Sequence, residues 1–600
     1  MFIKYIGGDF VNKQELDLLI TLKKHPFVNQ RALAKDSGYS LGLVNSALKS
    51  LVEANYLRSN FTLTKKALAL FEANAPKRAV ILAAGSGIRM VPINTETPKA
   101  LLQVKGEVLI ERQIRQLNEI GVTDIAVVVG FLKEKFEYLI DKFGVDLVYN
   151  GEYYTKNNLH SLFLVKNRLS NCYIVPCDLW CSENPFSSDE LYSWYAVTDE
   201  MTQNSDVFAN RKGQLAKVAY NQQGNRMFGI CYLDGKTGET VSKRLTAMEQ
   251  DIKYSHSFWE EAVYDGKKML PFAKVLPADS NFEINTYEQL RDIDSDSLQL
   301  KSEKIAIIAK AMDCHPDEIV DIKIQKKGMT NRSFLFTLRG KRYIMRVPGE
   351  GTDNLINRKE EAEVYKVIWD KKLCDDVIYI NAENGYKITA FLDNARVCDA
   401  ENNEDLRRCM KRLRDFHNMK LKVSHTFDIF EKINFYESLW LSEQSQYIDY
   451  EKTKANVFSL KNFVDRHKQD YSLTHIDAVP DNFLFCTDSE GKEDIRLIDW
   501  EYSAMQDPHV DIAMFIIYSM YDRAQADNLI DTYFTEGCDI ATRIKIYCYI
   551  SMCGLLWSNW CEYKRDLGVE FGEYSLKQYR FAKEYYTIAT ELIKKEGLDA

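Results

Sequence analysis

Three hydrophobic patterns follow one another along the chain. In the first part, apolar residues recur at helical spacing in three short segments, Leu16–Leu22, Asn29–Ser37 and Leu41–Ala54. In the second part, apolar runs of strand length alternate with amphipathic segments, which is typical of a parallel sheet covered by helices. In the third part, a strand, loop, strand pattern precedes further helices. The patterns predict a multidomain α/β chain with domains at residues 1–75, 76–298 and 299–600.

The first part has the pattern of a helix-turn-helix. Gly38 ends the second predicted helix, Ser40 caps the third, and two short β-prone runs at residues 56–57 and 61–64 predict a wing. The stretch resembles winged-helix regulators, with Leu41–Ala54 as the recognition helix. This resemblance implies DNA as a partner.

The charge of this part weakens the DNA interpretation. The first 75 residues hold ten Lys or Arg and six Asp or Glu, a net charge of +4 in a chain whose total is −9. The predicted recognition helix offers only Asn45, Ser46, Lys49 and Ser50 to a groove, and no arginine. A strong DNA binder shows a larger basic surface. Dimerisation or docking is therefore the alternative role for this domain.

A glycine-containing loop opens the second domain. The predicted strand Arg78–Ala84 is followed directly by Gly85 and Gly87, and glycines after a strand let backbone N–H groups approach phosphate oxygens. Met90 stands where a dinucleotide-binding fingerprint has its third glycine, which argues against NAD. The domain is therefore predicted to hold another nucleotide at the carboxyl ends of its strands.

A longer signature follows this loop. Residues 82–114, LAAGSGIRMVPINTETPKALLQVKGEVLIERQI, resemble the signature of nucleotidyltransferases that join an NTP to a phosphorylated small molecule. The resemblance implies a Rossmann-like α/β/α fold. Within that family the likeness to CTP:phosphocholine cytidylyltransferases implies CTP and phosphocholine as substrates. Four further stretches carry this likeness, Lys156–Leu162, Val175–Asp178, Phe258–Glu260 and Phe282–Thr286.

The resemblance also implies roles for single residues. Because two polyanions must meet, cations and a metal ion carry the catalysis, so Arg89 and Lys99 would neutralise the triphosphate and Asp178 would hold Mg²⁺. The family's second metal carboxylate lies in an E-I-D motif, where this chain has Glu283-Ile284-Asn285. Whether Glu283, Asn285 or another group completes the metal shell stays open. The remaining candidates are Trp259, against choline, and Leu82, Ala84, Gly85 and Gly87, as the backbone cradle for base and phosphates.

The third domain contains the motif of a phosphotransferase. Asp477, two residues after His475, and Asn482 match the spacing H-x-D-x-x-x-x-N, and Asp499 follows the next predicted strand. In such a site one carboxylate accepts the hydroxyl proton, and an amide oxygen and a second carboxylate hold Mg²⁺ against the nucleotide phosphates. Asp477 is therefore the predicted general base, and Asn482 and Asp499 are the predicted metal ligands.

Kinases grip the α- and β-phosphates with a strand cation and a helix carboxylate. A predicted phosphate loop at residues 327–332 is followed by a strand at residues 333–338, Arg346 lies on the next strand, and three glutamates lie on the helical segment after it. Since helical spacing lets only some of these acids face inward, Arg346 and Glu363 are the predicted pair. The domain resembles the choline/ethanolamine kinase and aminoglycoside phosphotransferase superfamily. This resemblance implies a bilobal, protein-kinase-like α+β fold in which Asp511 supports the catalytic loop.

Aromatic residues indicate the acceptor. Trp557 and Trp560 lie one helical turn apart on one helix face, and Trp500 and Tyr502 directly follow the predicted metal ligand. A quaternary ammonium has no N–H to donate, so aromatic faces and diffuse negative charge hold it. These four side chains are predicted to wall a choline pocket, and an aromatic core stripe is the alternative.

Composition and cysteine usage bear on the compartment. With 46% hydrophobic and 28% charged residues the chain is typical of a globular protein, and no apolar N-terminal run precedes a cleavage site. The longest apolar helical segment, at about residues 544–557, is too short to span a bilayer. The thirteen cysteines are scattered without a CxxC pair, as in a reducing compartment. We therefore expect a cytoplasmic enzyme without membrane insertion, whose state as a monomer or homo-oligomer is open.

The combined prediction is a bifunctional enzyme. It would phosphorylate choline with ATP and transfer CMP from CTP to phosphocholine, with Mg²⁺ as the cofactor. One alternative is a sugar-1-phosphate nucleotidyltransferase fused to a sugar or aminoglycoside kinase. Because such acceptors have many hydroxyls, their pockets are expected to contain Asp, Asn and His rather than Trp. A second alternative is a transcription regulator whose enzyme-like domains only sense a ligand. The sequence does not decide between choline and ethanolamine, or whether CTP is strictly required.

Overall fold

A computed structural model describes residues 3–6, 9–85, 87, 90, 92–93, 97–219, 221–324, 331–348, 355–442, 444–487, 493–567, 569 and 571–598. Its contacts separate two compact units, Met1–Ala306 and Ile307–Ala600. The first unit holds a winged helix and a sheet domain covered by helices, and the second holds a two-lobed α+β domain, so the predicted fold class is confirmed. The domain boundaries after residues 75 and 298 stay predictions.

The helices of the winged helix begin where capping residues predict them. Asn29 accepts a hydrogen bond from the backbone near the start of α2, and Ser40 does the same for α3. Gly38, with a φ of 72°, ends α2 in the left-handed conformation. The predicted wing is reduced to one β-bridge between Leu57 and Leu63. The elements are β1 (Ile3–Ile6), β2 (Asp9–Asn12), α1 (Lys13–Lys24), α2 (Gln30–Ser37), α3 (Leu41–Glu53) and α4 (Lys65–Asn74).

The winged helix shares its hydrophobic core with the sheet domain. Leu191, from the sheet domain, is 0% exposed and belongs to the same buried cluster as the leucines of α1 and α3. The Tyr192 hydroxyl donates to Asp17 of α1 over 2.5 Å, and Lys23 of α1 lies 3.0 Å from Asp189. The winged helix is therefore a packed part of the first unit.

We predict that Leu191→Ala destabilises the first unit by about 2–5 kcal/mol, because the lost side chain leaves a cavity between the winged helix and the sheet domain. Calorimetric unfolding of the whole chain measures the effect. Leu68→Ala on α4 is the matched control, because Leu68 is 47% exposed and its removal costs about 0.5 kcal/mol or less. Equal effects of the two substitutions would contradict a shared core.

Parallel strands form the centre of the sheet domain. β3 lies between β6 and β8 with both pairings parallel, and β7 continues the parallel set beyond β6. The described strands follow the order β11-β12-β15-β10-β13-β8-β3-β6-β7, and β14 pairs with β15. These strands are β3 (Arg78–Ala83), β6 (Asp124–Val129), β7 (Asp146–Tyr149), β8 (Cys172–Pro176), β10 (Trp194–Thr202), β11 (Val207–Ala209), β12 (Gln214–Lys217), β13 (Gly224–Leu233), β14 (Tyr264–Asp265) and β15 (Lys268–Leu276).

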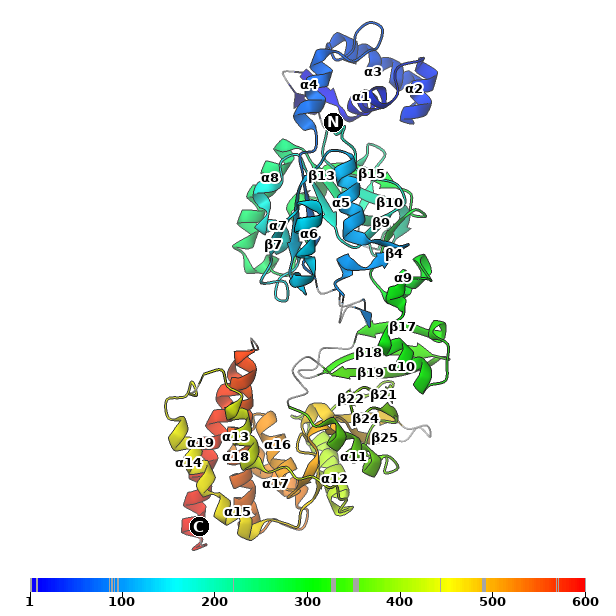
Figure 1. Cartoon of the computed structure of the whole chain (residues 1–600). Helices are drawn as coiled ribbons and strands as arrows, with labels where there is room; N and C mark the ends of the chain where they lie inside the picture. Colours follow the sequence, from blue (N-terminus) through cyan, green and yellow to red (C-terminus); the bar gives the residue numbers. More distant parts are fainter. Residues whose placement is uncertain are drawn as a thin grey trace. The chain divides into compact units, whose positions relative to one another are not determined.

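Helices cover both faces of this sheet (Figure 1). Ile81 of β3 belongs to a core shared with α5 and α6, whereas its neighbour Val80 belongs to a core shared with α7 and α8. Alternate residues of a strand point to opposite faces, so one strand serves both cores. The helices are α5 (Leu109–Glu119), α6 (Tyr138–Phe143), α7 (Asn158–Leu164), α8 (Gly235–Glu249) and α9 (Tyr287–Ile293). The short strand pairs are β4 (Gln103–Val104) with β5 (Glu107–Val108), and β9 (Leu179–Cys181) with β16 (Asn281–Glu283).

The second unit has a sheet lobe and a helical lobe. The sheet lobe is antiparallel, in the order β17-β18-β19-β21-β20, and α11 follows β19 in the chain. Its elements are β17 (Ile319–Ile324), β18 (Asn331–Leu338), β19 (Lys341–Pro348), α11 (Arg358–Ile368), β20 (Val377–Ile380) and β21 (Lys387–Ala390), and α10 (Glu303–Ala311) precedes them. Short strands lead into the helical lobe: β22 (Arg396–Val397), β23 (Ser472–Thr474), β24 (Phe483–Thr487), β25 (Glu493–Leu497) and β26 (Ala504–Gln506).

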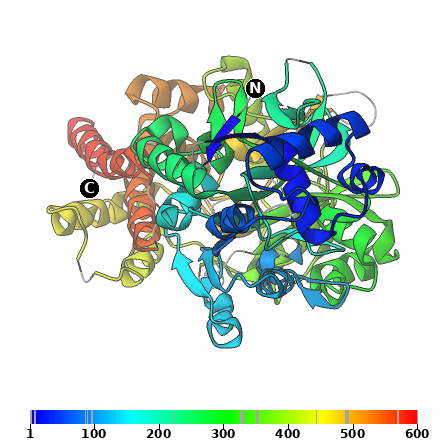
Figure 2. The same ribbon diagram turned by 90° about the horizontal axis from the view of Figure 1, so that it is seen from above.

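The helical lobe contains the longest helices of the described chain. α18 and α19 pack along each other (Figure 2). α18 has 27 residues, so the apolar segment predicted at residues 544–557 is only the middle of a longer helix. Across the described residues, every helix is too short or too polar to cross a membrane. The helices are α12 (Asn403–Asn418), α13 (Ile429–Ser438), α14 (Tyr450–Ser459), α15 (Lys461–His467), α16 (Val510–Tyr518), α17 (Arg523–Tyr533), α18 (Ile540–Asp566) and α19 (Glu573–Lys595).

Candidate active sites

The glycine loop after β3 lines a cavity of about 830 Å³ in the sheet domain. The predicted cradle residues, Leu82, Ala84, Gly85 and Gly87, all lie on its wall together with Lys99. Gly87 has a φ of 57°, and a Cβ there would lie 3.3 Å from the Lys99 Cβ, so a side chain would be strained. The predicted cation Arg89 lies outside the described residues. The structure thus brings the cradle and Lys99 together, and their roles stay predictions.

Lys99 lies between the predicted metal ligands. Its ammonium forms an ion pair with Asp178 and donates to the amide oxygen of Asn285 over 2.6 Å. β16 pairs with β9, which directly follows Asp178, and the Ile284 N–H donates to the Asp178 carbonyl over 2.9 Å. Asp178 Oδ1 is buried and has no hydrogen-bond partner among the described residues. With Glu283 on the same cavity wall, this oxygen fits a divalent cation.

Another part of this cavity wall is aromatic and acidic. Trp259 is 1% exposed, and its ring centroid lies 5.9 Å from that of Tyr195. The Tyr195 hydroxyl donates to Glu260 over 3.0 Å, and the second Glu260 oxygen is buried without a hydrogen-bond partner in the described part of the chain. Burial raises the pKa of Glu260 to about 7. An organic cation between these rings and this carboxylate would satisfy both.

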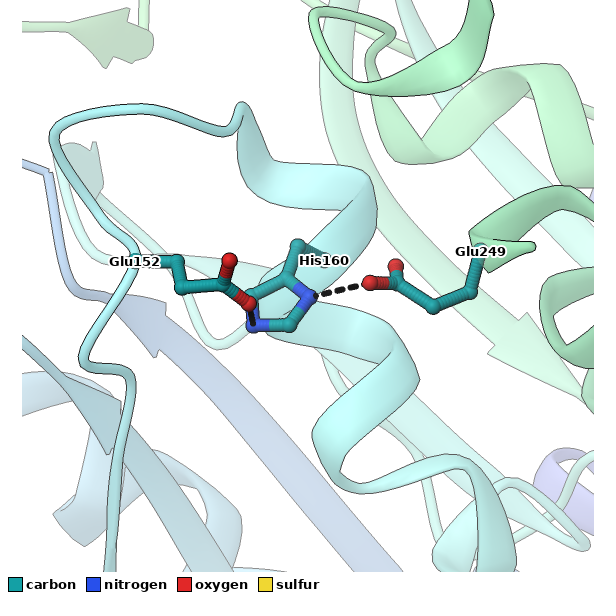
Figure 3. Close-up of side chains that lie close together, drawn as sticks. All are labelled: Glu152, His160 and Glu249. Atoms are coloured by element: carbon teal, nitrogen blue, oxygen red, sulfur yellow. Dashed lines mark hydrogen bonds and ion pairs between the residues drawn. The ribbon is translucent and has the colours of Figure 1, made fainter. Parts of the chain in front are cut away.

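Three side chains at the start of α7 could together reach one metal ion, Glu152, His160 and Glu249 (Figure 3). The His160 ring nitrogens lie 3.2 Å from Glu152 and 2.9 Å from Glu249. Lys156 Nζ, however, lies 3.0 Å from Glu152 and 2.7 Å from Glu249. Because the Lys156 ammonium is already paired with both carboxylates, we interpret the cluster as ion pairs that hold the loop before α7 against the end of α8.

This ion-pair cluster fixes residues of the cavity wall. Asn157 and Asn158, which follow Lys156 in the chain, both line the cavity. The Asn158 side-chain oxygen accepts from the backbone N–H of Trp259 over 2.8 Å, and the Asn157 side-chain amide donates to the His256 carbonyl over 3.1 Å. The Lys156–Leu162 stretch therefore positions the ring that the sequence assigned to choline.

The catalytic loop of the second unit is held in a strained conformation. Ile476 has a φ of 69°, which is rare for a β-branched residue. Both oxygens of the buried Asp511 carboxylate accept from this loop, one from the Ile476 N–H over 2.7 Å and the other from the His475 N–H over 3.0 Å. His417 lies 2.9 Å from the same carboxylate. This geometry agrees with the supporting role predicted for Asp511.

Asp477, Asn482 and Asp499 meet at a cavity of about 410 Å³. The Asn482 amide nitrogen donates to the Asp477 carboxylate over 3.1 Å and to its carbonyl over 2.9 Å, so the amide oxygen points to another partner. Asp499 has a φ of 66°. Burial, followed by the charge of Glu501, raises the pKa of Asp477 to about 7 and also raises the pKa of Asp499. Carboxylates that repel one another in this way fit a divalent cation between them.

The predicted pair of Arg346 with Glu363 is wrong, because Glu361 takes that position. Arg346 Nη1 lies 2.5 Å from one Glu361 oxygen, and Nη2 donates to the other over 2.8 Å. Burial alone would raise the pKa of Glu361, but the Arg346 charge lowers it to about 2. Residues two apart on a helix point about 200° apart, and Glu363 accepts instead from the Ser424 N–H and hydroxyl. The strand cation and helix carboxylate are thus present with a different acid.

Three of the four predicted aromatic residues line this cavity, Tyr502, Trp557 and Trp560. The rings of Tyr502 and Trp557 meet edge to face at 5.8 Å, and those of Trp557 and Trp560 lie 5.3 Å apart. Trp500 does not line the cavity, because it is fully buried in the core and its indole N–H donates to the Leu497 carbonyl over 2.7 Å. Its assignment to the pocket is therefore wrong. Tyr574 of α19 stands on the wall in addition.

Sequence reasoning missed several residues of the two sites. Glu260 lies inside a stretch that was recognised, but only its neighbour Trp259 was singled out. Lys387 is a charged residue in an otherwise apolar strand pattern, and this was the signal that could have found it. Tyr195 and Tyr574 carry no local signal, since folding alone brings them to the cavities.

Fold and site geometry define two classes of enzyme domain in one chain, a nucleotidyltransferase and a kinase-type phosphotransferase. Both classes use a divalent metal ion. Family comparisons agree with this division. The matches are a MobA-like NTP transferase domain at residues 79–192, a choline/ethanolamine kinase at residues 322–534 and a winged helix-turn-helix DNA-binding domain at residues 11–58.

Individual relatives identify the family. A choline-phosphate cytidylyltransferase of Streptococcus pneumoniae is 33% identical over 221 residues, which is 36% of this chain and 96% of the relative. The chain therefore belongs to the choline-phosphate cytidylyltransferase family. Protein LicA of Haemophilus influenzae is 28% identical over 263 residues, 42% of this chain and 96% of LicA. The crystal structure of choline kinase LicA from Streptococcus pneumoniae is 29% identical, covers 48% of this chain and 99% of that chain, and has a TM-score of 0.41. The predicted union of a cytidylyltransferase-type and a choline kinase-type domain is confirmed.

Proposed function

We propose that the chain makes CDP-choline in two steps. In the second unit the choline hydroxyl attacks the γ-phosphorus of ATP, which gives phosphocholine and ADP. In the first unit a phosphate oxygen of phosphocholine attacks the α-phosphorus of CTP, which gives CDP-choline and pyrophosphate. The observation that carries this proposal is the pair of cavities in one chain, each with metal-type oxygen ligands and an aromatic wall. Both steps take place in the cytosol, where ATP and CTP occur and where thirteen free thiols stay reduced.

In the kinase site each group has a position that fits its role. Asp477 accepts the hydroxyl proton, and its raised pKa of about 7 makes it an effective base near neutral pH. The Asn482 amide oxygen and Asp499 would hold Mg²⁺, whose charge would offset that of the nucleotide phosphates. Glu361 fixes the Arg346 guanidinium on the cavity wall, where it would meet the nucleotide phosphates.

In the transferase site Lys99 stabilises the charge that develops on the α-phosphate. Asp178 and Glu283 would hold Mg²⁺, whose charge would offset that of the triphosphate. Asn285 stands in place of the family's second carboxylate, and its amide oxygen lies 2.6 Å from the Lys99 ammonium. Asn285 therefore positions Lys99 beside Asp178. Because the Asn285 side chain is neutral, it does not offset the positive charge of Lys99 as a carboxylate would.

The lining of each cavity fits an organic cation, which indicates the identity of the phosphate acceptor. Trp259 and Tyr195 offer ring faces, and Glu260 offers a carboxylate oxygen that lacks a donor in the described chain. A trimethylammonium group has no N–H to donate. Aromatic ring faces and a nearby negative charge therefore hold it without directed hydrogen bonds. In the kinase cavity Trp557, Trp560 and Tyr502 supply the same chemistry. A sugar brings no positive charge to these rings or to the Glu260 carboxylate, which favours choline over the sugar alternative.

Phosphocholine affinity is expected to rise by about tenfold between about pH 6 and about pH 8, because the fraction of ionised Glu260 grows through its pKa of about 7. The Glu260→Gln variant is expected to bind phosphocholine more weakly. Its affinity should rise less with pH, because only the ionisation of the ligand phosphate remains. Isothermal titration at several pH values measures both. The raised pKa also means that ionised Glu260 lowers folding stability above about pH 5, so the Gln variant is expected to melt at a higher temperature at pH 8. A Gln variant with the wild-type pH profile would contradict this role.

DNA binding by the winged helix stays a prediction. Asn45, Ser46 and Lys49 of α3 are exposed, but Lys49 lies 3.8 Å from Glu53, which reduces its charge toward a phosphate. Fluorescence anisotropy with a labelled duplex, read at low and at physiological salt, tests it. Binding that is absent at low salt would leave docking or dimerisation as the role.

One incubation tests the whole proposal. The purified chain is mixed with choline, ATP, CTP and Mg²⁺, and the products are separated by mass spectrometry. CDP-choline is the expected product, and omission of ATP should stop it unless phosphocholine is supplied. Parallel reactions with ethanolamine, hexoses and kanamycin distinguish the acceptors. A sugar product would favour the sugar kinase alternative, and the absence of any turnover would favour the ligand sensor.

A further inference from the structure

A buried lysine in the kinase cavity has no role in the scheme above. Lys387 begins β21 and stands opposite Arg346 of β19 in the register of the antiparallel pair. Both side chains line the cavity that holds Asp477 and Asp499, and Lys387 is only 6% exposed. The position is therefore inside the site and not on the surface of the lobe.

The polar partners of Lys387 differ from those of its neighbours. Its ammonium donates to the Tyr365 hydroxyl of α11 and lies 4.3 Å from the centroid of that ring. Among the described residues no carboxylate forms an ion pair with it, whereas Arg346 and Arg358 are both paired with Glu361. This buried ammonium donates to a neutral hydroxyl and has no carboxylate at ion-pair distance in the described chain, although Glu361 and Asp499 are close enough to interact with its charge.

The ligand that this charge fits is an anion. Arg346 brings a directed guanidinium whose Nε lacks a hydrogen-bond acceptor among the described residues, but Glu361 binds its Nη1 and Nη2 and offsets its charge. Lys387 brings an ammonium whose hydrogen bond goes to the neutral Tyr365 hydroxyl and not to a carboxylate. A triphosphate offers several oxygens and several negative charges, and it needs both kinds of group.

We propose that Lys387 is a second phosphate-binding cation of the kinase site, which leaves the Tyr365 hydroxyl and contacts the triphosphate of ATP when the nucleotide enters. This inference rests on the proposed kinase function. It adds a strand residue to the groups that grip the nucleotide, next to Arg346 in the same sheet.

The test compares ATP with adenosine, which lacks phosphates. Lys387→Met in the whole chain is expected to weaken ATP binding by about 10- to 100-fold in titration calorimetry with Mg²⁺, while adenosine binding stays unchanged. Lys387→Arg is expected to recover most of the ATP affinity, and Tyr365→Phe is expected to keep it. Lys341→Met, at the exposed start of β19, is the matched control and should bind ATP like the wild type. Unchanged adenosine binding by the same variant reports that the kinase unit is folded.

Two outcomes would overturn the inference. Unchanged ATP affinity in Lys387→Met would show that the ammonium makes no contact with the phosphates. An equal loss of ATP and adenosine affinity would show a structural role in the lobe. ATP binding is measured without an acceptor, so the test does not depend on choline. A wild-type chain that binds no ATP would instead refute the proposed kinase function, and the inference with it.

Discussion

Asp477→Ala is expected to lower the turnover of choline phosphorylation by about 10²- to 10⁴-fold, which is the usual contribution of a positioned general base. Asp477 is placed for this role by Asn482, whose amide donates to its carboxylate over 3.1 Å. The rate of CMP transfer to added phosphocholine should not change, because that chemistry occurs in the other unit. A coupled assay for ADP measures the first rate, and pyrophosphate release measures the second.

Two controls make this result specific. Asp470→Asn replaces an exposed carboxylate seven residues earlier and should leave both rates unchanged. Asp477→Asn keeps the shape of the side chain and should lose activity like the alanine variant. Because the pKa of Asp477 is about 7 in the folded chain, its ionised form lowers stability as the pH rises from about 4 to 7, so Asp477→Asn should melt at a higher temperature at pH 8. Substantial kinase activity in either variant would refute the assignment of the base.

Lys99→Met is expected to lower the rate of cytidylyl transfer by about 10²- to 10³-fold, the typical loss when one preorganised group that stabilises transition-state charge is removed. Lys99 is held for this role by Asp178 and Asn285, so its ammonium needs no reorganisation when charge develops on the α-phosphate. Pyrophosphate release with CTP and phosphocholine measures the loss, and kinase activity in the same protein should be normal.

The matched control for Lys99 is Lys212→Met, which removes an exposed ammonium from the same domain. This variant should transfer CMP like the wild type. Lys99→Arg should recover only part of the rate, because a wider guanidinium cannot fit between both partners in the same way. A Lys99→Met variant that keeps most of its rate would show that the triphosphate is neutralised elsewhere.

The parts of the sites that are contiguous in the chain could be predicted from sequence. Asp477 and Asn482 lie five residues apart on one loop, and the cradle from Leu82 to Gly87 directly follows a strand, so motif spacing and strand ends were enough to locate them. The fold types were predictable for a related reason, because alternation of strands and helices along the chain determines the layers of the sheet domain.

Contacts between distant segments were not predictable in the same way. Glu361 and Glu363 both lie on α11, and only the helix phase against β19 decides which one meets Arg346. The sequence does not indicate which face of α11 is buried, because charged residues lie on the buried face as well as on the exposed one. Trp500 was misassigned for a related reason, since a tryptophan beside a catalytic residue can turn into the core as easily as into the pocket, and its indole N–H found a backbone carbonyl there.

The packing of Leu191 against the winged helix has a consequence for the transferase domain taken alone. Without the winged helix, Leu191 and its neighbours at residues 189–192 would meet water. A stand-alone form of this domain would need hydrophilic side chains there to stay free of aggregation.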